Sequence, residues 1–309
     1  MCGANRTMPR QANYRAAKRL GHVMLAVLSL LVAHGILHPT WAEADSPARS
    51  PQGECHRAQF RAIVDVGHTA EVPGATSARG AAEYTFNLRL AREIKQQLID
   101  AGFVRTVLLV TAGPTRAGLA KRVASANRSS ADLFLSIHHD SVPDRFLETW
   151  KYEGRELYFS DRFKGHSIFI SNENSEPRAS LLFGRLLGNQ LKERGLQYAK
   201  HYTEPFMGRR RRELVDEQAG VYRYDQLIVL KDTRIPAVLL EAGSIINRDE
   251  EVEMASAERR SLIAQAVSDA VEKFCAARSP RHPDELHAGA AHPAKQAVRG
   301  ATPPVNPRR

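Results

Sequence analysis

The chain has 309 residues, of which 43% are hydrophobic and 25% charged, as is typical of a globular protein. This length suits one domain of about 200 residues with tails. No long apolar run follows the N-terminal region, so we do not expect the mature protein to span a membrane. The formal charge of +10 lies largely at the two ends of the chain, so the folded part is close to neutral and nucleic acid is not an expected partner.

Residues 1–42 have the pattern of a secretory signal peptide. A segment with five basic residues and no acidic residue precedes the apolar stretch 23–37, and Thr40-Trp41-Ala42 offers a cleavage site. The alternative interpretation is an uncleaved N-terminal anchor. Cleavage would give a secreted protein without a transmembrane anchor. Because no wall-anchoring repeats are visible, we expect the periplasm rather than a Gram-positive surface.

After a polar linker at residues 43–54, strand patterns and helix patterns alternate along the chain. Apolar runs that end in Gly or polar residues predict strands, and apolar residues repeating every three or four positions predict helices. Alternation of this kind predicts an α/β fold in three layers, with about six mainly parallel strands and helices on both faces, in a single catalytic domain at residues 55–276. The expected strands are 61–67, 104–110, 132–138, 167–171, 227–231 and 237–243, and the expected helices are 83–102, 115–129, 178–194 and 256–274.

Three segments do not follow this alternation. Residues 142–166 and 199–226 are long inserted loops, which in a compact domain are usually functional lids or disordered segments. The second of them contains four consecutive arginines, Arg209–Arg212, which indicate either a solvated surface patch or a contact with a partner or an anionic wall polymer. Residues 277–309, rich in Pro, Ala, His and Arg, predict a disordered tail.

Removal of the signal would leave two cysteines, Cys55 and Cys275, at the two ends of the predicted domain. An even number of cysteines in an oxidising compartment suggests a disulfide, and domain termini often lie close together. We therefore predict a bond between Cys55 and Cys275. The alternative is a pair of free or buried thiols.

Four short segments place polar side chains at the ends of apolar runs or at the start of a helix, where a rigid scaffold can direct them into one cleft. Two histidines and a glutamate that bind a metal, with a second glutamate that accepts a proton, are the minimum requirement for a catalytic zinc site. Sequence patterns for helical zinc proteases, serine hydrolases and nucleotide-binding loops are absent. The four segments are Asp65-Val66-Gly67-His68 with Pro73-Gly74-Ala75, Glu83, Ser136-Ile137-His138-His139-Asp140, and Pro236-Ala237-Val238-Leu239-Leu240-Glu241.

Each candidate also has a simpler interpretation. A lone histidine after a strand, such as His68 or His138, is more often structural. Glu83 would be favoured in the first turn of a helix by the helix dipole alone. Glu241 would be costly to bury unpaired after four apolar residues, so it either reaches a polar cleft or forms a structural salt bridge.

The ordered set of segments, from about residue 62 to 274, resembles the zinc-dependent N-acetylmuramoyl-L-alanine amidases of the type 3 family. The resemblance implies one Zn²⁺ held by His68, Glu83 and His138, with Asn87 four residues after the ligand Glu83. It also implies that Glu241 takes a proton from water and returns it to the leaving amine. The family usually has Pro-Gly-His-Gly-Gly at the first segment, whereas this chain has Val66 before Gly67 and Thr69-Ala70 after His68.

The two residues after His138 have less certain roles. His139 is an alternative metal ligand, or it contacts the ligands without binding the metal itself. Asp140 could orient an imidazole, as carboxylates near metal sites do, or merely cap a turn.

The resemblance implies hydrolysis of the amide between N-acetylmuramic acid and L-alanine in peptidoglycan, for wall remodelling or daughter-cell separation. The alternatives are a catalytically silent wall-binding or regulatory module, and a zinc peptidase that cuts within the stem peptide. Related enzymes can carry an inserted helix that plugs the site until an activator protein removes it, so either inserted loop could be such a lid. The candidate plugging carboxylates are Glu148, Glu153, Glu156, Glu204, Glu213 and Glu217.

Overall fold

A computed structural model of the protein describes residues 54–278. The predicted signal peptide, nearly all of the linker, and the predicted tail from residue 279 onward lie outside these residues. None of the helices in residues 54–278 has the length and apolar character that a bilayer span requires.

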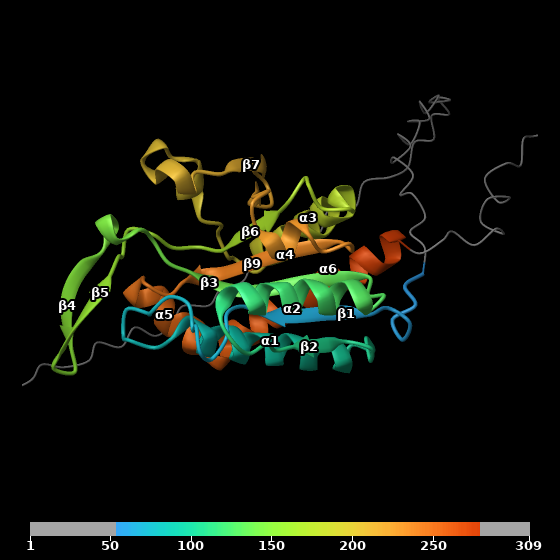
Figure 1. The fold of residues 1–309 in the computed structure, drawn as a ribbon, viewed down its shortest axis with the longest axis horizontal. Helices are drawn as coiled ribbons and strands as arrows, with labels where there is room; N and C mark the ends of the chain where they lie inside the picture. The colour runs from blue at the N-terminus through green and yellow to red at the C-terminus, as the bar shows by residue number, and fades with distance from the viewer. Residues whose placement is uncertain (1–53, 279–309) are drawn as a thin grey trace, which may run out of the picture. The chain divides into compact units, whose positions relative to one another are not determined.

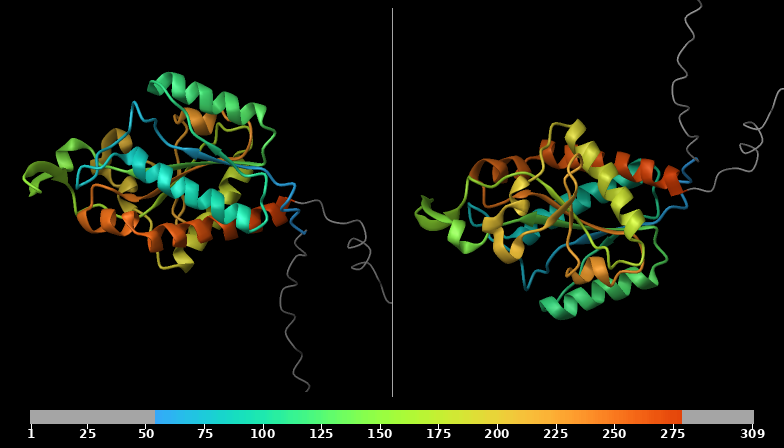
Figure 2. Two further views of the ribbon diagram at one scale, coloured as in Figure 1. Left: turned by 90° about the horizontal axis from the view of Figure 1, so that it is seen from below. Right: turned by 90° about the horizontal axis from the view of Figure 1, so that it is seen from above.

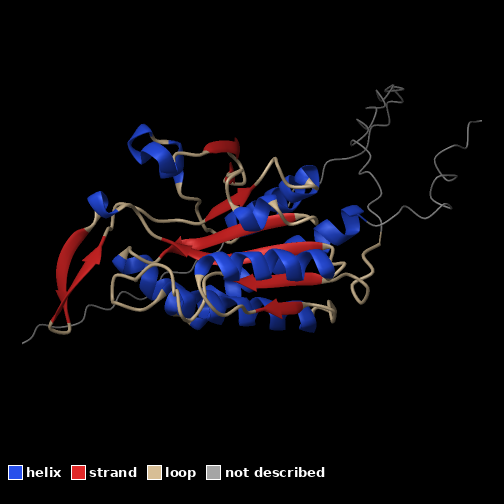
Figure 3. Ribbon diagram, viewed as in Figure 1, coloured by secondary structure: helices blue, strands red, loops and turns tan. Residues whose placement is uncertain are grey.

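A mixed sheet of seven strands lies at the centre of the fold, in the order β2-β1-β3-β9-β6-β8-β7 (Figures 1 and 3). Neighbours are parallel from β2 to β9 and between β6 and β8, whereas β6 is antiparallel to β9 and β7 to β8. The predicted α/β fold with a mainly parallel sheet is therefore confirmed. The strands are β1 (Ala62–Val66), β2 (Val107–Leu109), β3 (Leu133–Asp140), β6 (Ser167–Ile170), β7 (Glu213–Asp216), β8 (Val221–Arg223) and β9 (Ala237–Ser244).

Helices cover both faces of the sheet, as Figure 2 shows. On one face, α1 (Glu83–Asp100), α3 (Pro177–Glu193) and α6 (Ala257–Arg278) bury their apolar stripes against the sheet. On the other face lie α2 (Thr115–Arg128) and the short α4 (Ile228–Lys231). A further helix, α5 (Arg248–Ala255), follows β9.

Successive residues of β3 face opposite sides of the sheet, which determines where its polar end points. Leu133, Leu135 and Ile137 belong to the core beneath α1 and α6, whereas Phe134 belongs to the core on the α2 side. Burial of these apolar side chains on both faces is typical of parallel strands between helix layers. The same alternation directs the side chains of Ser136 and His138 toward the α2 side.

One predicted strand is wrong. Residues 227–231 form the turn of helix α4, in which Val229 and Leu230 are buried. An apolar run this short is compatible with a buried strand or with one helical turn, and periodicity cannot separate the two. Five of the predicted strands are present, and the other two strands of the sheet, β7 and β8, come from the segment predicted as a loop.

The two inserted segments are ordered. Residues 142–166 contain the 3-10 turn η1 (Asp144–Phe146) and a hairpin of β4 (Glu148–Tyr152) and β5 (Arg155–Phe159). Positive φ angles of 48° at Glu153 and 76° at Gly154 make the two-residue turn that joins these strands. Figure 1 shows the hairpin beyond the ends toward which β1, β3 and β9 run.

Residues 199–226, drawn in gold in Figure 1, contain η2 (Lys200–Thr203) and η3 (Pro205–Arg210) as well as β7 and β8. Tyr222 of β8 donates a hydrogen bond of 2.6 Å to the carbonyl oxygen of Ala199, and the Arg212 amide donates to that of Tyr202 at 2.8 Å. The first bond joins the start of the segment to strand β8, and the second joins η2 to the residue before β7.

Cys55 and Cys275 form a disulfide, with their Cα atoms 5.2 Å apart. It links the segment before β1 to the last turns of α6, across a sequence separation of 220 residues.

We predict that replacing both cysteines with serine lowers the free energy of unfolding by about 2–5 kcal/mol, because the bond restricts a very long loop in the unfolded chain. Urea unfolding of the oxidised, reduced and double-serine proteins measures this. Reductant should lower the midpoint of the parent protein and leave that of the double-serine variant unchanged. An equal midpoint for oxidised and reduced parent protein would contradict a stabilising role.

Candidate active site

The first ligand candidate, His68, lies immediately beyond β1, where the backbone takes a positive φ of 66°. Residues other than glycine rarely adopt this conformation, so the surrounding structure must hold it. Arg122 of α2 does so, since its guanidinium donates to the carbonyl oxygen of Val66 at 2.9 Å and also to that of His68. The position of the imidazole therefore depends on a buried arginine from another element.

Arg122 is itself held by Asp65, three residues before His68. The guanidinium lies 3.0 Å from one oxygen of the fully buried Asp65 carboxylate, and Ser136 of β3 donates a hydrogen bond of 2.7 Å to the other. Burial raises the pKa of Asp65 to about 7, against the opposing effect of Arg122. The contacts of Arg122 with Asp65 and of Ser136 with Asp65 were not predicted from the sequence. The available signal was that Arg122 stands three residues after Leu119 and four before Ala126, on the apolar face of α2.

Glu83 is the first residue of α1, and its buried carboxylate lies between two imidazoles. One oxygen is 3.0 Å from Nε2 of His68 and the other is 3.1 Å from Nδ1 of His138. The amide of Ala75 also donates to this carboxylate at 3.0 Å, as does Nδ2 of Asn87 at 3.1 Å. Burial disfavours the charged form, but the hydrogen bonds from the two histidines hold the pKa of Glu83 well below its ordinary value.

His68, Glu83 and His138 can supply a set of metal ligands. Their candidate donor atoms all lie within 4.8 Å of one another. Two imidazole nitrogens and a carboxylate oxygen suit zinc, and three protein ligands leave a coordination position for water or substrate, as catalytic zinc sites require. The residues present therefore fit a catalytic metal ion.

Two glycines make room for these three side chains. A Cβ atom on Gly67 would lie 2.4 Å from Nε2 of His138. A Cβ atom on Gly74, where φ is +81°, would lie 2.4 Å from Oε2 of Glu83 and 2.7 Å from the His68 ring. The glycine of the Pro73-Gly74-Ala75 motif is thus required twice, by its backbone conformation and by the close approach of two ligand side chains.

Glu241 of β9 is the cross-strand neighbour of His138. The two strands are parallel and in register at this point, so the carboxylate lies beside a candidate ligand. Its Oε2 atom is buried and has no hydrogen-bond partner among the described residues. Burial, followed by the negative charges of Asp140 and Glu83, raises the pKa of Glu241 well above its ordinary value.

Asp140 faces the second inserted segment rather than an imidazole ligand. The Tyr202 hydroxyl donates to it at 2.6 Å and the Ser141 amide at 2.8 Å, while the Arg210 guanidinium lies 3.6 Å away. Burial raises its pKa to about 6. In residues 54–278 it forms no hydrogen bond with His68 or His138, so its partners give no support to the predicted role of orienting a ligand.

His139 points away from the three ligand candidates. Its Nδ1 atom lies 2.7 Å from Oδ1 of Asn87, and its backbone amide donates to Glu83 at 3.3 Å. Burial lowers the pKa of this imidazole to about 3, which keeps it neutral. Since Asn87 also donates to Glu83, His139 contacts the candidate ligand set through an amide side chain.

No glutamate of the inserted segments reaches the site in the described part of the chain. The hydrogen bonds and ion pairs of His68, Glu83, His138 and Glu241 include none of the six candidates for a plugging carboxylate. One of them, Glu213, is paired with Arg223 at 2.7 Å.

One hollow is lined by two of the ligand candidates, and a second lies beside the turn that contacts Glu83. One of about 90 Å³ is lined by His68 and His138 and opens toward α2 and α4. Another of about 260 Å³ lies between residues 75–77, Ser141 and the β5 residues Leu157 and Tyr158. Ala75, whose amide donates to Glu83, lines this second hollow, whereas the three ligand candidates do not.

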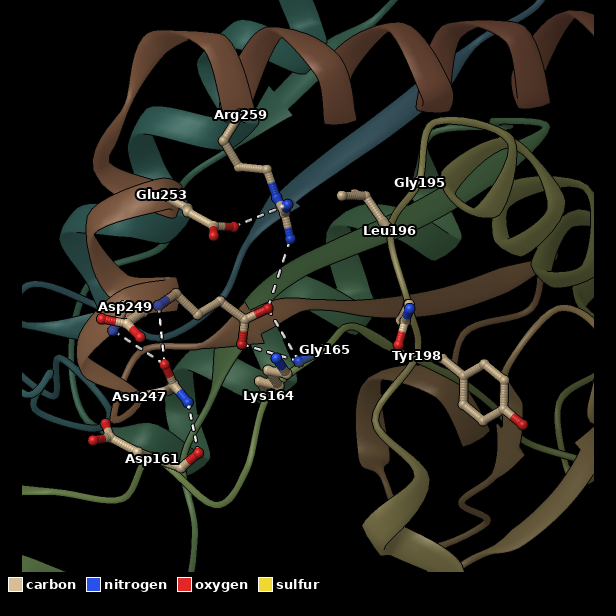
Figure 4. Close-up of a pocket in the computed structure, with 12 residues that line it drawn as sticks. Asp161, Lys164, Gly165, Gly195, Leu196, Tyr198, Asn247, Asp249, Glu253 and Arg259 are labelled. Atoms are coloured by element: carbon tan, nitrogen blue, oxygen red, sulfur yellow. Dashed lines mark hydrogen bonds and ion pairs between the residues drawn. The ribbon is translucent and has the colours of Figure 1, made fainter.

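A larger hollow of about 410 Å³ contains none of the candidate site residues (Figure 4). Its polar groups largely satisfy one another. The buried carboxylate of Glu250 accepts hydrogen bonds from the amides of Gly165, at 3.0 Å, and Ser244, at 2.9 Å. Arg259 lies 3.3 Å from Glu253. These contacts join α5 and α6 to the end of β9.

Comparison with known proteins places most of the domain in one family. The sequence model of the family described as N-acetylmuramoyl-L-alanine amidase matches residues 62–273. Among curated relatives, the amidase AmiA of Escherichia coli is 24% identical over 228 residues, covering 69% of this chain and 75% of that protein. AmiA of Salmonella typhimurium is 24% identical over 272 residues, covering 81% and 88%.

Solved structures share the fold. The amidase Ami1 of Mycobacterium smegmatis superposes with a TM-score of 0.55 at 19% identity, covering 71% of this chain and 98% of that one. The CwlD amidase of Clostridioides difficile, solved in complex with the GerS lipoprotein, superposes with a TM-score of 0.50 at 19% identity, covering 70% and 98%.

We predict that Gly74→Ala lowers the affinity for Zn²⁺ at least tenfold, because the added methyl group would displace Glu83 and His68. Competition with a chromophoric chelator measures the affinity. Gly195→Ala is the matched control, since Gly195 has the same φ of +81° but nothing within 4 Å of a Cβ atom. Both variants should lose about 1–2 kcal/mol of stability from the left-handed backbone. Wild-type zinc affinity in Gly74→Ala would show that the close approach is unimportant.

Proposed function

The chain belongs to the N-acetylmuramoyl-L-alanine amidase family, and on that premise we propose that it is a zinc-dependent hydrolase of the amide between N-acetylmuramic acid and L-alanine in peptidoglycan. The observation that carries this proposal is the arrangement of four side chains from four separate elements. His68, Glu83 and His138 bring their donor atoms together, and Glu241 lies beside His138 in register with it.

In this proposal His68, Glu83 and His138 hold one Zn²⁺. When bound, the ion would supply Lewis-acid chemistry, polarising the scissile carbonyl and making water a better nucleophile. The protein contributes the fixed positions of its ligands, which depend on the Asp65–Arg122 pair below His68 and on Asn87 beside Glu83.

Glu241 would be the proton carrier. Its uncommitted Oε2 atom can accept a proton from the attacking water and deliver it to the amine that leaves with L-alanine. A carboxylate with a raised pKa suits this task better than an ordinary one, because it accepts a proton more readily.

Two other functions are alternatives to an amidase. A silent wall-binding or regulatory module would not need its ligand set and proton carrier to be complete, and both are complete here. A zinc peptidase that cuts within the stem peptide would use the same four residues, so only the identity of the products separates it from an amidase.

We further propose that the enzyme acts outside the cytoplasm, in the periplasm, in wall remodelling or daughter-cell separation. The basic and apolar pattern of residues 1–42 supports this, although it lies outside the described residues. An activator protein is also part of the proposal. Its support is indirect, since CwlD is an amidase that was solved in complex with a lipoprotein.

We predict that Glu241→Gln lowers kcat on peptidoglycan by about 10²-fold or more, because an amide cannot accept the proton. Bound zinc should remain near the wild-type amount. Dye release from labelled peptidoglycan measures the rate, with mass spectrometry of the released peptides. Intact stem peptides with a free L-alanine amine identify an amidase, whereas shortened peptides would identify a peptidase.

The matched control is Glu156→Gln, an isosteric change on the exposed face of the hairpin, which should have wild-type activity. A chelator should abolish activity and added Zn²⁺ should restore it. Full activity of Glu241→Gln, or activity that survives complete removal of metal, would refute the proposed mechanism. Bound zinc without release of any wall fragment would favour the regulatory module.

A further inference from the structure

The second inserted segment delivers one arginine to the candidate active site. Arg210, the last residue of η3, lies with its guanidinium 3.6 Å from Asp140, two residues beyond His138 on β3. The sequence indicated only a run of four arginines, without distinguishing their roles.

The four arginines of this run differ in what they contact. Arg211 donates to the carbonyl oxygen of Thr203 at 2.8 Å. Arg212 donates to the carbonyl oxygens of Arg209 and Arg211 and lies 3.6 Å from the centre of the Tyr224 ring. Arg209 is exposed. Of the four, only Arg210 forms an ion pair with Asp140, two residues beyond the ligand candidate His138.

The guanidinium of Arg210 has N–H donors that are not used. Within residues 54–278 it makes no hydrogen bond, and its ion pair with Asp140 is long. Its side chain is 42% exposed, in contrast to the 6% of Asp140. Asp140 does not depend on it for hydrogen bonds, because Tyr202 and Ser141 already donate to the carboxylate. Arg210 therefore has the exposure and the free donors to bind a second anion.

The charge of the site explains why a cation is needed at this place. The ionised carboxylates of Glu83 and Asp140 would repel an acidic group that approached them, and Arg210 opposes this repulsion on the Asp140 side. Arg122, the other arginine close to the ligands, is buried and committed to Asp65 and to backbone carbonyls. A guanidinium is also well matched to a carboxylate, with which it forms two parallel hydrogen bonds.

We propose that Arg210 is a specificity-determining residue that binds a free carboxylate of the stem peptide close to the scissile amide. This inference rests on the proposed amidase function. It identifies the preferred substrate as a muramoyl peptide in which the residue after L-alanine carries an acid rather than an amide.

The test compares N-acetylmuramoyl-L-alanyl-D-glutamate with N-acetylmuramoyl-L-alanyl-D-isoglutamine, each with its γ-carboxyl group blocked as the methylamide. The two substrates then differ in one group, and only the first has a free carboxylate. The full chain should have the lower KM for the acid. Arg210→Ala should raise the KM for the acid about tenfold or more, the loss expected for a charge-assisted contact, and change kcat little. The KM for the amide should be nearly unchanged. Arg210→Lys should recover part of the affinity.

Arg209→Ala is the matched control, because it removes the same charge from the neighbouring exposed position, and it should match the wild type on both substrates. The inference would be overturned if Arg210→Ala raised the KM for the acid and for the amide equally, or if it lowered only kcat. A residue that only supports Asp140 would act in that way. If Arg209→Ala raised the KM for the acid as much as Arg210→Ala does, the effect would come from positive charge in general and not from a contact made by Arg210.

Binding without turnover separates this inference from the proposed reaction. In the Glu241→Ala background, calorimetry should show tighter binding of the acid than of the amide, and the difference should disappear when Arg210→Ala is added. If the wild-type chain hydrolyses neither compound but still binds the acid more tightly, the proposed amidase reaction is wrong and the proposed role of Arg210 stands. Equal affinity for the acid and the amide, or no binding of either, overturns the role of Arg210.

Discussion

The Glu83 carboxylate, between the imidazoles of His68 and His138, is the interaction on which the rest of the site depends. A buried carboxylate is costly unless it is fully bonded, and here five groups satisfy it. Two of them are the imidazoles, two are the backbone amides of Ala75 and His139, and one is the side chain of Asn87. The turn at Gly74, the start of α1 and the ends of β1 and β3 must therefore form together, because each provides a partner for the same carboxylate.

Chain topology explains why residues distant in sequence meet at this carboxylate. Strand β9 is the last in the chain, yet it inserts between β3 and β6. This insertion brings Glu241 beside His138, and the antiparallel pairing of β6 with β9 places Ser167 on its other side. The second inserted segment then reaches the same edge of the sheet through Tyr202 and Asp140. The central sheet thus positions the ligand candidates, while the second inserted segment changes the charge around them.

The sequence allowed prediction of elements whose signal is local. Helix α1 has a regular apolar repeat, and the ends of β1, β3 and β9 are marked by polar residues after apolar runs. The helical turn α4 was mistaken for a strand, because an apolar run of that length fits both structures. Strands β7 and β8 and the hairpin were missed because their stability comes from pairing and from contacts such as Trp150 with Ala78. Arg122 and Arg210 were missed because their roles depend on neighbours far away in sequence.

The disulfide between Cys55 and Cys275 has a consequence for an enzyme that meets proteases outside the cytoplasm, where we propose that this one acts. Exposed segments such as the β4–β5 hairpin are where proteases cut most readily. Every such cut falls between the two cysteines, so the resulting fragments stay covalently joined. The piece with His68, Glu83 and His138 cannot diffuse away from the piece with Glu241, and the broken chain can reassemble its sheet as an intramolecular event.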